Sequence, residues 1–207
     1  MSKAGDVFQN PVTGERAVVR IGTEESGGEL LVVDLSIRPD GAVMGEHVHP
    51  TIEERFTVLR GEVGFRLAGE VSTAERGVTL TVAPGIAHDW WNAGRDEALV
   101  RVEVRPSARF EAMISNAFGL AQDGKVNKRG VPNLLQLAVF AREFDDVMHL
   151  TRPPRIVQRI LFALLAPLAR LLGYRGSYPE YRARGPSETV QVEQLDVAAA
   201  LAECPAR

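Results

Sequence analysis

The sequence from Gly41 to Gly61 reads GAVMGEHVHPTIEERFTVLRG, and it places two histidines and a carboxylate close together. Successive side chains of a β-strand alternate between two faces, so His47 and His49 share one face. Glu54 opens the next run of strand-like composition. A barrel interior where imidazoles and a carboxylate converge is hard to explain without a metal. This donor set suits one divalent transition ion, namely Fe, Mn, Ni, Zn or Co.

A second stretch, from Gly77 to Asn92, reads GVTLTVAPGIAHDWWN and supplies His88. The chain has four histidines, and three of them lie in these two stretches. The fourth, His149, lies in a segment with helical periodicity, so we expect it at the surface or at a helix end. A vestigial site that holds no metal is the alternative interpretation.

These stretches resemble the two motifs of the cupin superfamily. The first motif is Gly, five residues, His-x-His, three or four residues, Glu, six residues and Gly. The positions that fit it are Gly41, His47, His49, Glu54 and Gly61. Its spacing selects Glu54 over Glu53, because only Glu54 leaves six residues before the final glycine.

The second motif is Gly, five residues, Pro-x-Gly, two residues, His, three residues and Asn. Gly77, Gly85, His88 and Asn92 fit it, whereas Ala83 stands where the family usually has proline. Pro84 beside it can still stiffen the turn.

The resemblance implies a mainly β fold, a cupin double-stranded β-helix (jelly-roll) barrel followed by an α-helical C-terminal extension. It also implies a metal held by His47, His49, Glu54 and His88. Many short strands separated by Gly and Pro turns independently indicate a barrel or sandwich. The resemblance indicates no single reaction, since cupins include dioxygenases, isomerases, decarboxylases, sugar-binding regulators and storage proteins.

We divide the chain into an irregular lead-in (1–14), the barrel (15–106), a helical extension (107–185) and an acidic tail (186–207). Helical periodicity after Pro106 predicts helices over 110–118, 133–150 and 156–172. Pro167 is expected to kink or break the third helix. We expect that helix to dock its apolar surface on the barrel or on a partner and to shield the site. The alternative, which we favour less, is that it lies on an anionic membrane surface.

The charge of the chain is small overall but unevenly distributed. The formal net charge is −3, and nothing global points to nucleic acid. Residues 150–185 carry seven Arg and one Glu, between two acidic segments. The single Cys204 forms no internal disulfide, and the N-terminus has no apolar signal core, so we expect a cytoplasmic protein. Small barrels of this family commonly dimerise, so we also expect a homodimer.

The same alternation predicts an apolar and aromatic pocket beside the metal. Counting by two along the strands places Phe56, Val58, Trp90 and Asn92 on the ligand side. These side chains would form a substrate pocket or simply fill a small barrel. Arg101 and Glu103 share one face of a later strand, which we expect to be solvated rather than directed into the pocket.

Two hypotheses of function follow. Three His and one Glu leave two positions free on a six-coordinate ion, as a catalytic site requires. The first hypothesis is a metal-dependent oxygenase or isomerase acting on a small, fairly apolar molecule. The second is a non-catalytic small-molecule-binding or sensor cupin.

Overall fold

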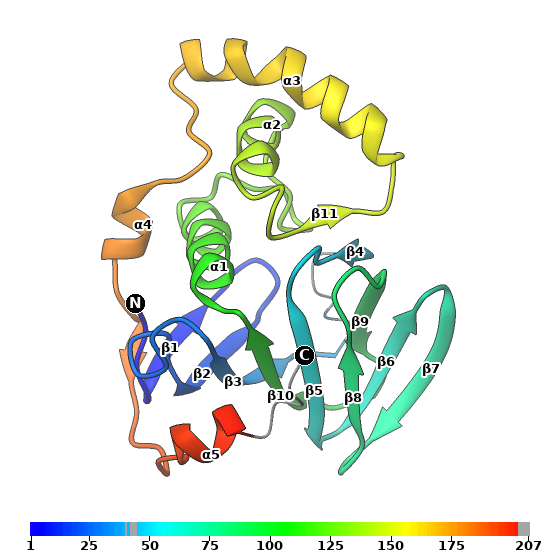
Figure 1. The fold of residues 1–207 in the computed structure, drawn as a ribbon, viewed down its shortest axis with the longest axis vertical. Coiled ribbons are helices and arrows are strands. Elements are labelled where there is room, and N and C mark those ends of the chain that lie inside the picture. Colours follow the sequence, from blue (N-terminus) through cyan, green and yellow to red (C-terminus); the bar gives the residue numbers. More distant parts are fainter. Residues whose placement is uncertain (40, 42–44, 203–207) are drawn as a thin grey trace.

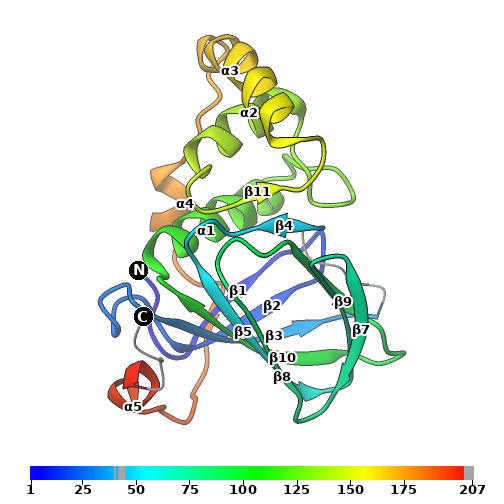
Figure 2. The same ribbon diagram turned by 45° about the vertical axis from the view of Figure 1, so that its right-hand side comes forward.

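The computed structural model describes residues 1–39, 41 and 45–202 of the chain, so Cys204 lies outside the described residues. Two antiparallel sheets face each other in the barrel, and most of the helices gather at one end of it (Figure 1). Figure 2 shows the strands wrapping around a common interior, with α1 (Ala108–Gln122) lying across the end of the barrel where most of the helices gather. The mainly β fold with C-terminal helices confirms the predicted fold class.

The larger sheet has the strand order β12-β1-β2-β3-β10-β5-β8. Its strands are β1 (Asp6–Gln9), β2 (Arg16–Ile21), β3 (Leu31–Ile37), β5 (Glu53–Arg60), β8 (Thr79–Val82), β10 (Ala98–Arg105) and β12 (Glu188–Thr189). Buried and partly buried residues alternate along β10, as they do in a strand with one face on the core. The central strands therefore turn their apolar side chains into the barrel.

The smaller sheet has the strand order β11-β4-β9-β6-β7. Its strands are β4 (His47–Val48), β6 (Glu62–Leu67), β7 (Glu70–Glu75), β9 (His88–Asn92) and β11 (His149–Leu150). Gly64 on β6 has no room for a Cβ atom, which would lie 2.2 Å from the Trp91 ring on β9. The close approach of these two strands therefore requires glycine at this position.

Both ends of the chain contribute strands to the larger sheet. The segment expected to be an irregular lead-in contains β1, and the acidic tail contains β12, which pairs with β1 at Asp6 and Thr189. The pairing of β1 with β12 joins residues far apart in the sequence, and the local periodicity of either segment gives no information about it.

The helices are α1 (Ala108–Gln122), α2 (Leu134–Glu143), α3 (Arg155–Leu171), α4 (Pro179–Ala183) and α5 (Val197–Ala202). The Asn133 side chain caps α2 by accepting hydrogen bonds from the backbone N–H groups of Leu135 and Gln136, at 3.1 and 3.0 Å. Helix α1 packs against α4, and helix α2 packs against α3.

The helix predicted over 133–150 is wrong in its second half. It ends at Glu143, and the chain then turns so that Phe144 and Val147 enter the core, each 1% exposed. The backbone N–H of Val147 donates to the Phe144 carbonyl at 2.9 Å in this turn. A buried turn and a helix place apolar residues at the same three- and four-residue spacing, so the periodicity did not distinguish them.

The predicted third helix is present as α3 and continues through Pro167 without a break. Pro167 and Ala163 are both exposed, so water can bond the carbonyl that proline leaves without a donor. The helix packs on α2 and lies at the end of the molecule farthest from the barrel, not over the barrel mouth (Figure 1). No helix in the described part of the chain is long and apolar enough to cross a membrane.

One apolar core joins the barrel to the first two helices of the extension. Phe56 and Phe65 of the barrel belong to the same buried cluster as Met113, Phe140 and Phe144. Because these side chains are packed together, the barrel and these helices stabilise each other.

We therefore expect Phe144→Ala to lower the free energy of unfolding by about 3–5 kcal/mol, as large core truncations do. Urea denaturation followed by tryptophan fluorescence and by helical circular dichroism measures it, and both probes should report one transition. Leu134→Ala, at a 52% exposed position of α2, is the control and should change stability little. Two well-separated transitions in the wild type would contradict a shared core.

Asp123, just after α1, connects that helix to α4. Its carboxylate accepts hydrogen bonds from Lys125, Tyr181 and Arg184 at 2.8–2.9 Å. The Lys125 hydrogen bond, followed by those of Arg184 and Tyr181, holds the pKa of Asp123 below its ordinary value of 3.8. A carboxyl whose pKa is lowered on folding stabilises the fold above its unfolded pKa, and this contribution is lost on acidification.

We expect Asp123→Asn to be less stable than the wild type at neutral pH, by an amount that shrinks as the pH falls below 3.8. Urea denaturation of both proteins over a pH series gives the difference at each pH. A difference that stays constant, or grows, on acidification would show that Asp123 stabilises the fold by some other means.

Candidate metal centre

Four buried side chains meet inside the barrel. His47 lies on β4, His49 follows that strand, Glu54 is on β5 and His88 begins β9. One nitrogen or oxygen atom of each residue can be chosen so that all four atoms lie within 4.8 Å of one another. The side chains that the sequence predicts as ligands are therefore brought together by strands from both sheets.

Strand pairing accounts for this convergence. His47 on β4 lies directly opposite His88 on β9, so the two imidazole ring centroids are 4.3 Å apart. The backbone N–H of Gly85 donates to the His49 carbonyl at 2.8 Å, which connects the two motifs. Gly85 has a φ of 83°, a conformation that glycine adopts without strain, and the turn can therefore deliver His88 to the first motif.

A backbone carbonyl orients each imidazole ring. The Nδ1–H groups of His47, His49 and His88 donate to the carbonyls of Gly45, Val147 and Ile86, at 2.7, 2.7 and 3.0 Å. A carbonyl only accepts, so Nδ1 carries the proton in all three rings. This arrangement directs Nε2 toward the centre, and second-shell hydrogen bonds of this kind are typical of metal-binding histidines.

The Glu54 carboxylate is the negative group of the cluster. The His88 Nε2–H donates to one of its oxygens at 2.8 Å, and His49 Nε2 lies 3.5 Å from the same oxygen. Burial opposes the ionised form of Glu54, but the His88 hydrogen bond and the neighbouring imidazoles outweigh it, so its pKa is lowered. The centre therefore retains its carboxylate at neutral pH.

The pKa values of the three imidazoles shift in different directions. Burial, followed by the charge of His88, lowers the pKa of His47 to about 4, and burial also lowers that of His49. For His88, burial acts in the same direction, but the hydrogen bond to Glu54 outweighs it and raises the pKa. His47 and His49 thus present neutral Nε2 atoms, which is the form that binds metal ions.

The helical extension contributes directly to this centre. The carbonyl that orients His49 belongs to Val147, and β11 pairs with β4 by placing His149 opposite Val48 and Leu150 opposite His47. Sequence reasoning missed this contribution, because every residue has a backbone carbonyl and the residue type of Val147 does not indicate what its carbonyl binds.

The expected placement of His149 at the surface or at a helix end is wrong. The residue lies in β11 and is partly buried, and burial lowers its pKa. It lies outside the group of four, and it lines a cavity among the helices instead.

A pocket of about 160 Å³ adjoins the centre and is lined mainly by apolar side chains. Phe56 and Trp90 line it, as the alternation predicted, together with Phe110 and Met113 from α1. Helical periodicity placed these last two residues on an apolar face, but it could not show that the face closes the end of a barrel.

Two predicted pocket residues do not line it. Val58 is buried farther along β5, among the core residues. The Asn92 amide donates to the carbonyls of Ile37 and Asp96, at 2.9 and 2.8 Å, so it closes a turn instead. Arg101 pairs with Asp34 at 2.7 Å on the face of the sheet away from the pocket.

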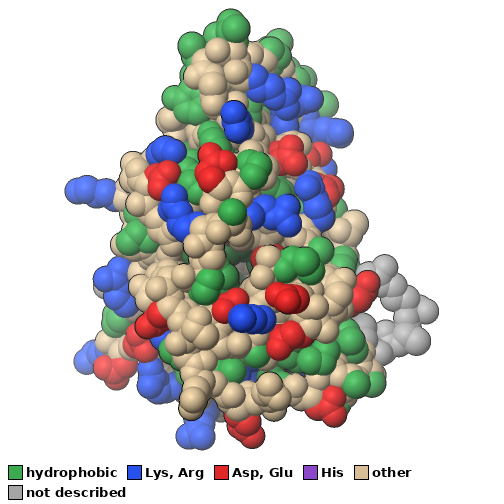
Figure 3. All heavy atoms as spheres, turned by 90° about the vertical axis from the view of Figure 1, so that its left-hand side faces the viewer, with side chains coloured by type: hydrophobic (Ala, Val, Ile, Leu, Met, Phe, Trp, Pro, Cys, Tyr) green, Lys and Arg blue, Asp and Glu red, His purple; other side chains and the backbone are tan. Residues whose placement is uncertain are grey.

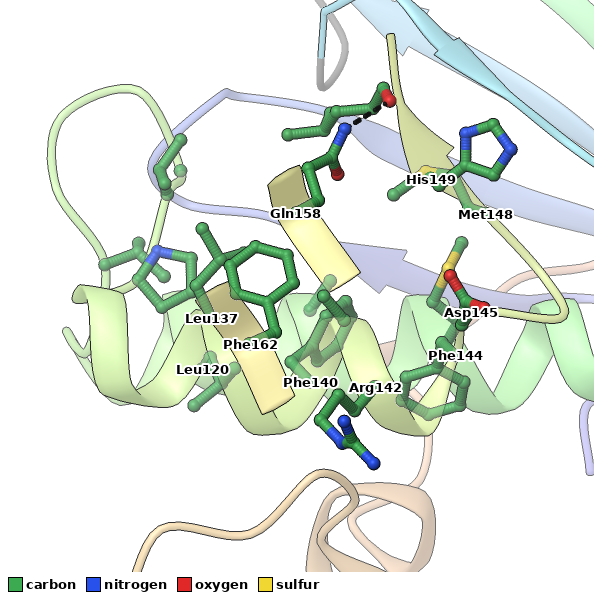
Figure 4. A pocket seen from close by; sticks show the side chains of 18 of the residues that line it. Leu120, Leu137, Phe140, Arg142, Phe144, Asp145, Met148, His149, Gln158 and Phe162 are labelled. Carbon is green, nitrogen blue, oxygen red and sulfur yellow. Dashed lines mark hydrogen bonds between the residues drawn. The ribbon is translucent and has the colours of Figure 1, made fainter. Parts of the chain in front are cut away.

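A second cavity, of about 240 Å³, lies among the helices. Figure 4 shows Leu120, Leu137, Phe140 and Phe162 around it. Met113 and Met148 line both this cavity and the barrel pocket, so the two spaces are neighbours. The barrel pocket is the one beside the four converging side chains.

Comparison with known proteins identifies the family of the barrel. Residues 34–104 match the family model for the cupin domain. No curated protein matches the chain.

Solved structures resemble about half of the chain at low identity. An uncharacterised conserved protein with a double-stranded β-helix domain from Klebsiella pneumoniae is 22% identical, with a TM-score of 0.39, over 52% of this chain and 84% of that one. A predicted oxalate decarboxylase from Thermotoga maritima is 17% identical, with a TM-score of 0.44, over 51% and 94%. The cupin domain of Schizosaccharomyces pombe Cnp3 is 10% identical, with a TM-score of 0.38, over 51% and 71%.

Values this low carry no argument about function, and the family assignment rests on the matched domain together with both sequence motifs. That domain holds all four converging side chains. Residues 34–104 of the chain therefore form a cupin domain.

Proposed function

We propose that His47, His49, Glu54 and His88 bind one divalent transition metal ion, and that the protein is a metal-dependent oxygenase or isomerase. Its substrate would be a small, fairly apolar molecule held in the barrel pocket. The bound ion would supply Lewis acidity and, where it is redox-active, electrons.

The observation that carries the proposal is the orientation of the three imidazoles. Each Nδ1–H is already bonded to a backbone carbonyl, which leaves the Nε2 atoms facing a buried carboxylate. A barrel core that served packing alone would gain nothing from burying an ionised group, since burial of a charge is costly. The three nitrogen donors and the one oxygen donor fit Fe, Mn, Ni, Zn or Co.

The residues around the centre support the choice of substrate. Phe56, Trp90 and Phe110 would contact an apolar molecule and exclude water from it. His49 and His88 are held by their hydrogen bonds, so the substrate would meet a rigid set of donors. Without an ion, the His88 Nε2–H donates to the Glu54 carboxylate at 2.8 Å, and metal binding through both residues would release this proton.

A non-catalytic small-molecule-binding or sensor protein is the second candidate. The apolar lining of the barrel pocket favours retention of a ligand as much as its turnover. Mass spectrometry of small molecules that co-purify with tag-free protein, together with metal analysis, distinguishes the two candidates. An enzyme should turn over such a molecule with one or two metals only, whereas a binder should retain it after metal exchange.

We expect His49→Ala and His88→Ala each to lower metal affinity by at least about tenfold, since loss of even a supporting group has such an effect. Elemental analysis and metal titration of the purified variants measure the loss. His149→Ala is the control and should keep the wild-type metal content. Equal metal content in all three variants would refute the assignment of the ligands.

A homodimer stays a prediction, which sedimentation equilibrium of the metal-loaded protein tests. We expect a dimer, because cupin barrels often associate, and a monomer at all concentrations would contradict it.

A further inference from the structure

Helix α3 (Arg155–Leu171) and the residue after it present a continuous apolar surface to solvent. The exposed side chains that form this outer face are Ile156, Val157, Ile160, Leu161, Leu164, Leu168, Leu171 and Leu172. Leu164 is 72% exposed and Leu171 is 84% exposed. At 3.6 residues per turn, all eight fall within one half of the helix circumference, which makes a stripe rather than scattered exposure.

The opposite face of the helix is already used for packing. Gln158, Phe162, Ala166 and Ala169 are buried, and the last two pack with Val139 of α2. Figure 4 shows Gln158 and Phe162 directed toward the helical cavity, with the Gln158 amide bonded to the Leu150 carbonyl. The outer face therefore serves neither the cavity nor the core, and we find no contact that covers it in the described chain.

The charges beside this face are all positive. From Val147 to Pro179 the sequence contains no Asp or Glu. Arg159 and Arg170 lie eleven positions apart, so they fall on the same flank of the helix, between the outer and the buried faces. In Figure 3, hydrophobic and basic side chains predominate at the α3 end of the molecule, while acidic side chains lie nearer the barrel.

We infer that the outer face of α3 docks on an anionic membrane surface. The helix would lie in the plane of the interface, with its leucines among the acyl chains and its flanking arginines at the lipid phosphates. Membrane binding accounts for both the exposed apolar face and the lack of acidic residues near it. The acyl chains would bury the apolar side chains, and the lipid phosphates would pair with the arginines. The inference does not depend on the metal centre.

The position of α3 suits this partner. In both ribbon views, the helix lies at the end of the molecule farthest from the barrel (Figures 1 and 2). A flat surface can therefore contact the outer face without meeting the barrel. Its 17 residues are fewer than the roughly 20 that a spanning helix needs.

A second copy of the chain fits the same face less well. In an antiparallel pair of α3 helices centred between Leu164 and Leu165, Arg159 would lie beside Arg170 of the partner subunit. No acidic residue of this segment could neutralise that pair. Like charges placed together at a dry interface cost several kcal/mol, so the charge pattern favours a lipid surface.

Flotation of the full-length protein with vesicles tests the inference. One set contains phosphatidylcholine alone, and the other contains phosphatidylcholine and phosphatidylserine. The wild type should float with the second set and much less with the first. Leu164→Glu/Leu168→Glu should reduce partitioning at least about tenfold, because charges replace two leucines that would lie among the acyl chains. Arg159→Gln/Arg170→Gln should reduce it roughly thirty-fold, at about 1 kcal/mol per cation.

Val71→Glu is the matched control, because Val71 is 62% exposed on β7, far from α3, and should float like the wild type. Unchanged metal content and circular dichroism establish that each variant is folded. Absence of flotation, or equal flotation with both vesicle sets, would overturn the inference. Sedimentation showing a dimer that Leu164→Glu/Leu168→Glu dissociates without vesicles would assign the face to a second copy, and would also overturn it.

Discussion

The buried carboxylate of Glu54 is the constraint on which the rest of the barrel depends. An ionised group that is 4% exposed needs compensating partners, and the imidazoles of His49 and His88 lie 3.5 and 2.8 Å from one of its oxygens. Those imidazoles are held in turn by backbone carbonyls, so their orientation is decided by the strands and turns around them. The strands and turns of the fold therefore determine the geometry of the proposed metal site.

The helical extension takes part in the same arrangement. Val147 supplies the carbonyl for His49, and β11 continues the sheet beside β4, so a segment about a hundred residues away in sequence supports the centre. Phe140 and Phe144 join the barrel core, while Phe110 and Met113 line the pocket. Changes within the extension can therefore affect the chemistry of the barrel through ring orientation and pocket shape.

Helix α3 differs from the rest of the extension in how its apolar residues are used. Its small and aromatic residues pack on α2, whereas its isoleucines and most of its leucines are exposed. Helix α3 is therefore held on α2 by its buried face, which carries the smaller part of the helix's apolar side chains. The larger apolar face is exposed, and it lies at the end of the molecule opposite the barrel that holds the proposed metal centre.

The sequence by itself determined the mainly β barrel, the helices after Pro106 and the four residues of the centre, because period-two alternation and motif spacing act locally. Only the tertiary structure decided that the predicted helix over 133–150 ends at Glu143, that Asn92 closes a turn, and that both chain ends add strands to one sheet. It also decided which face of α3 is exposed. Periodicity shows which residues are apolar together, but burial depends on the element packed against them, and that element is distant in sequence.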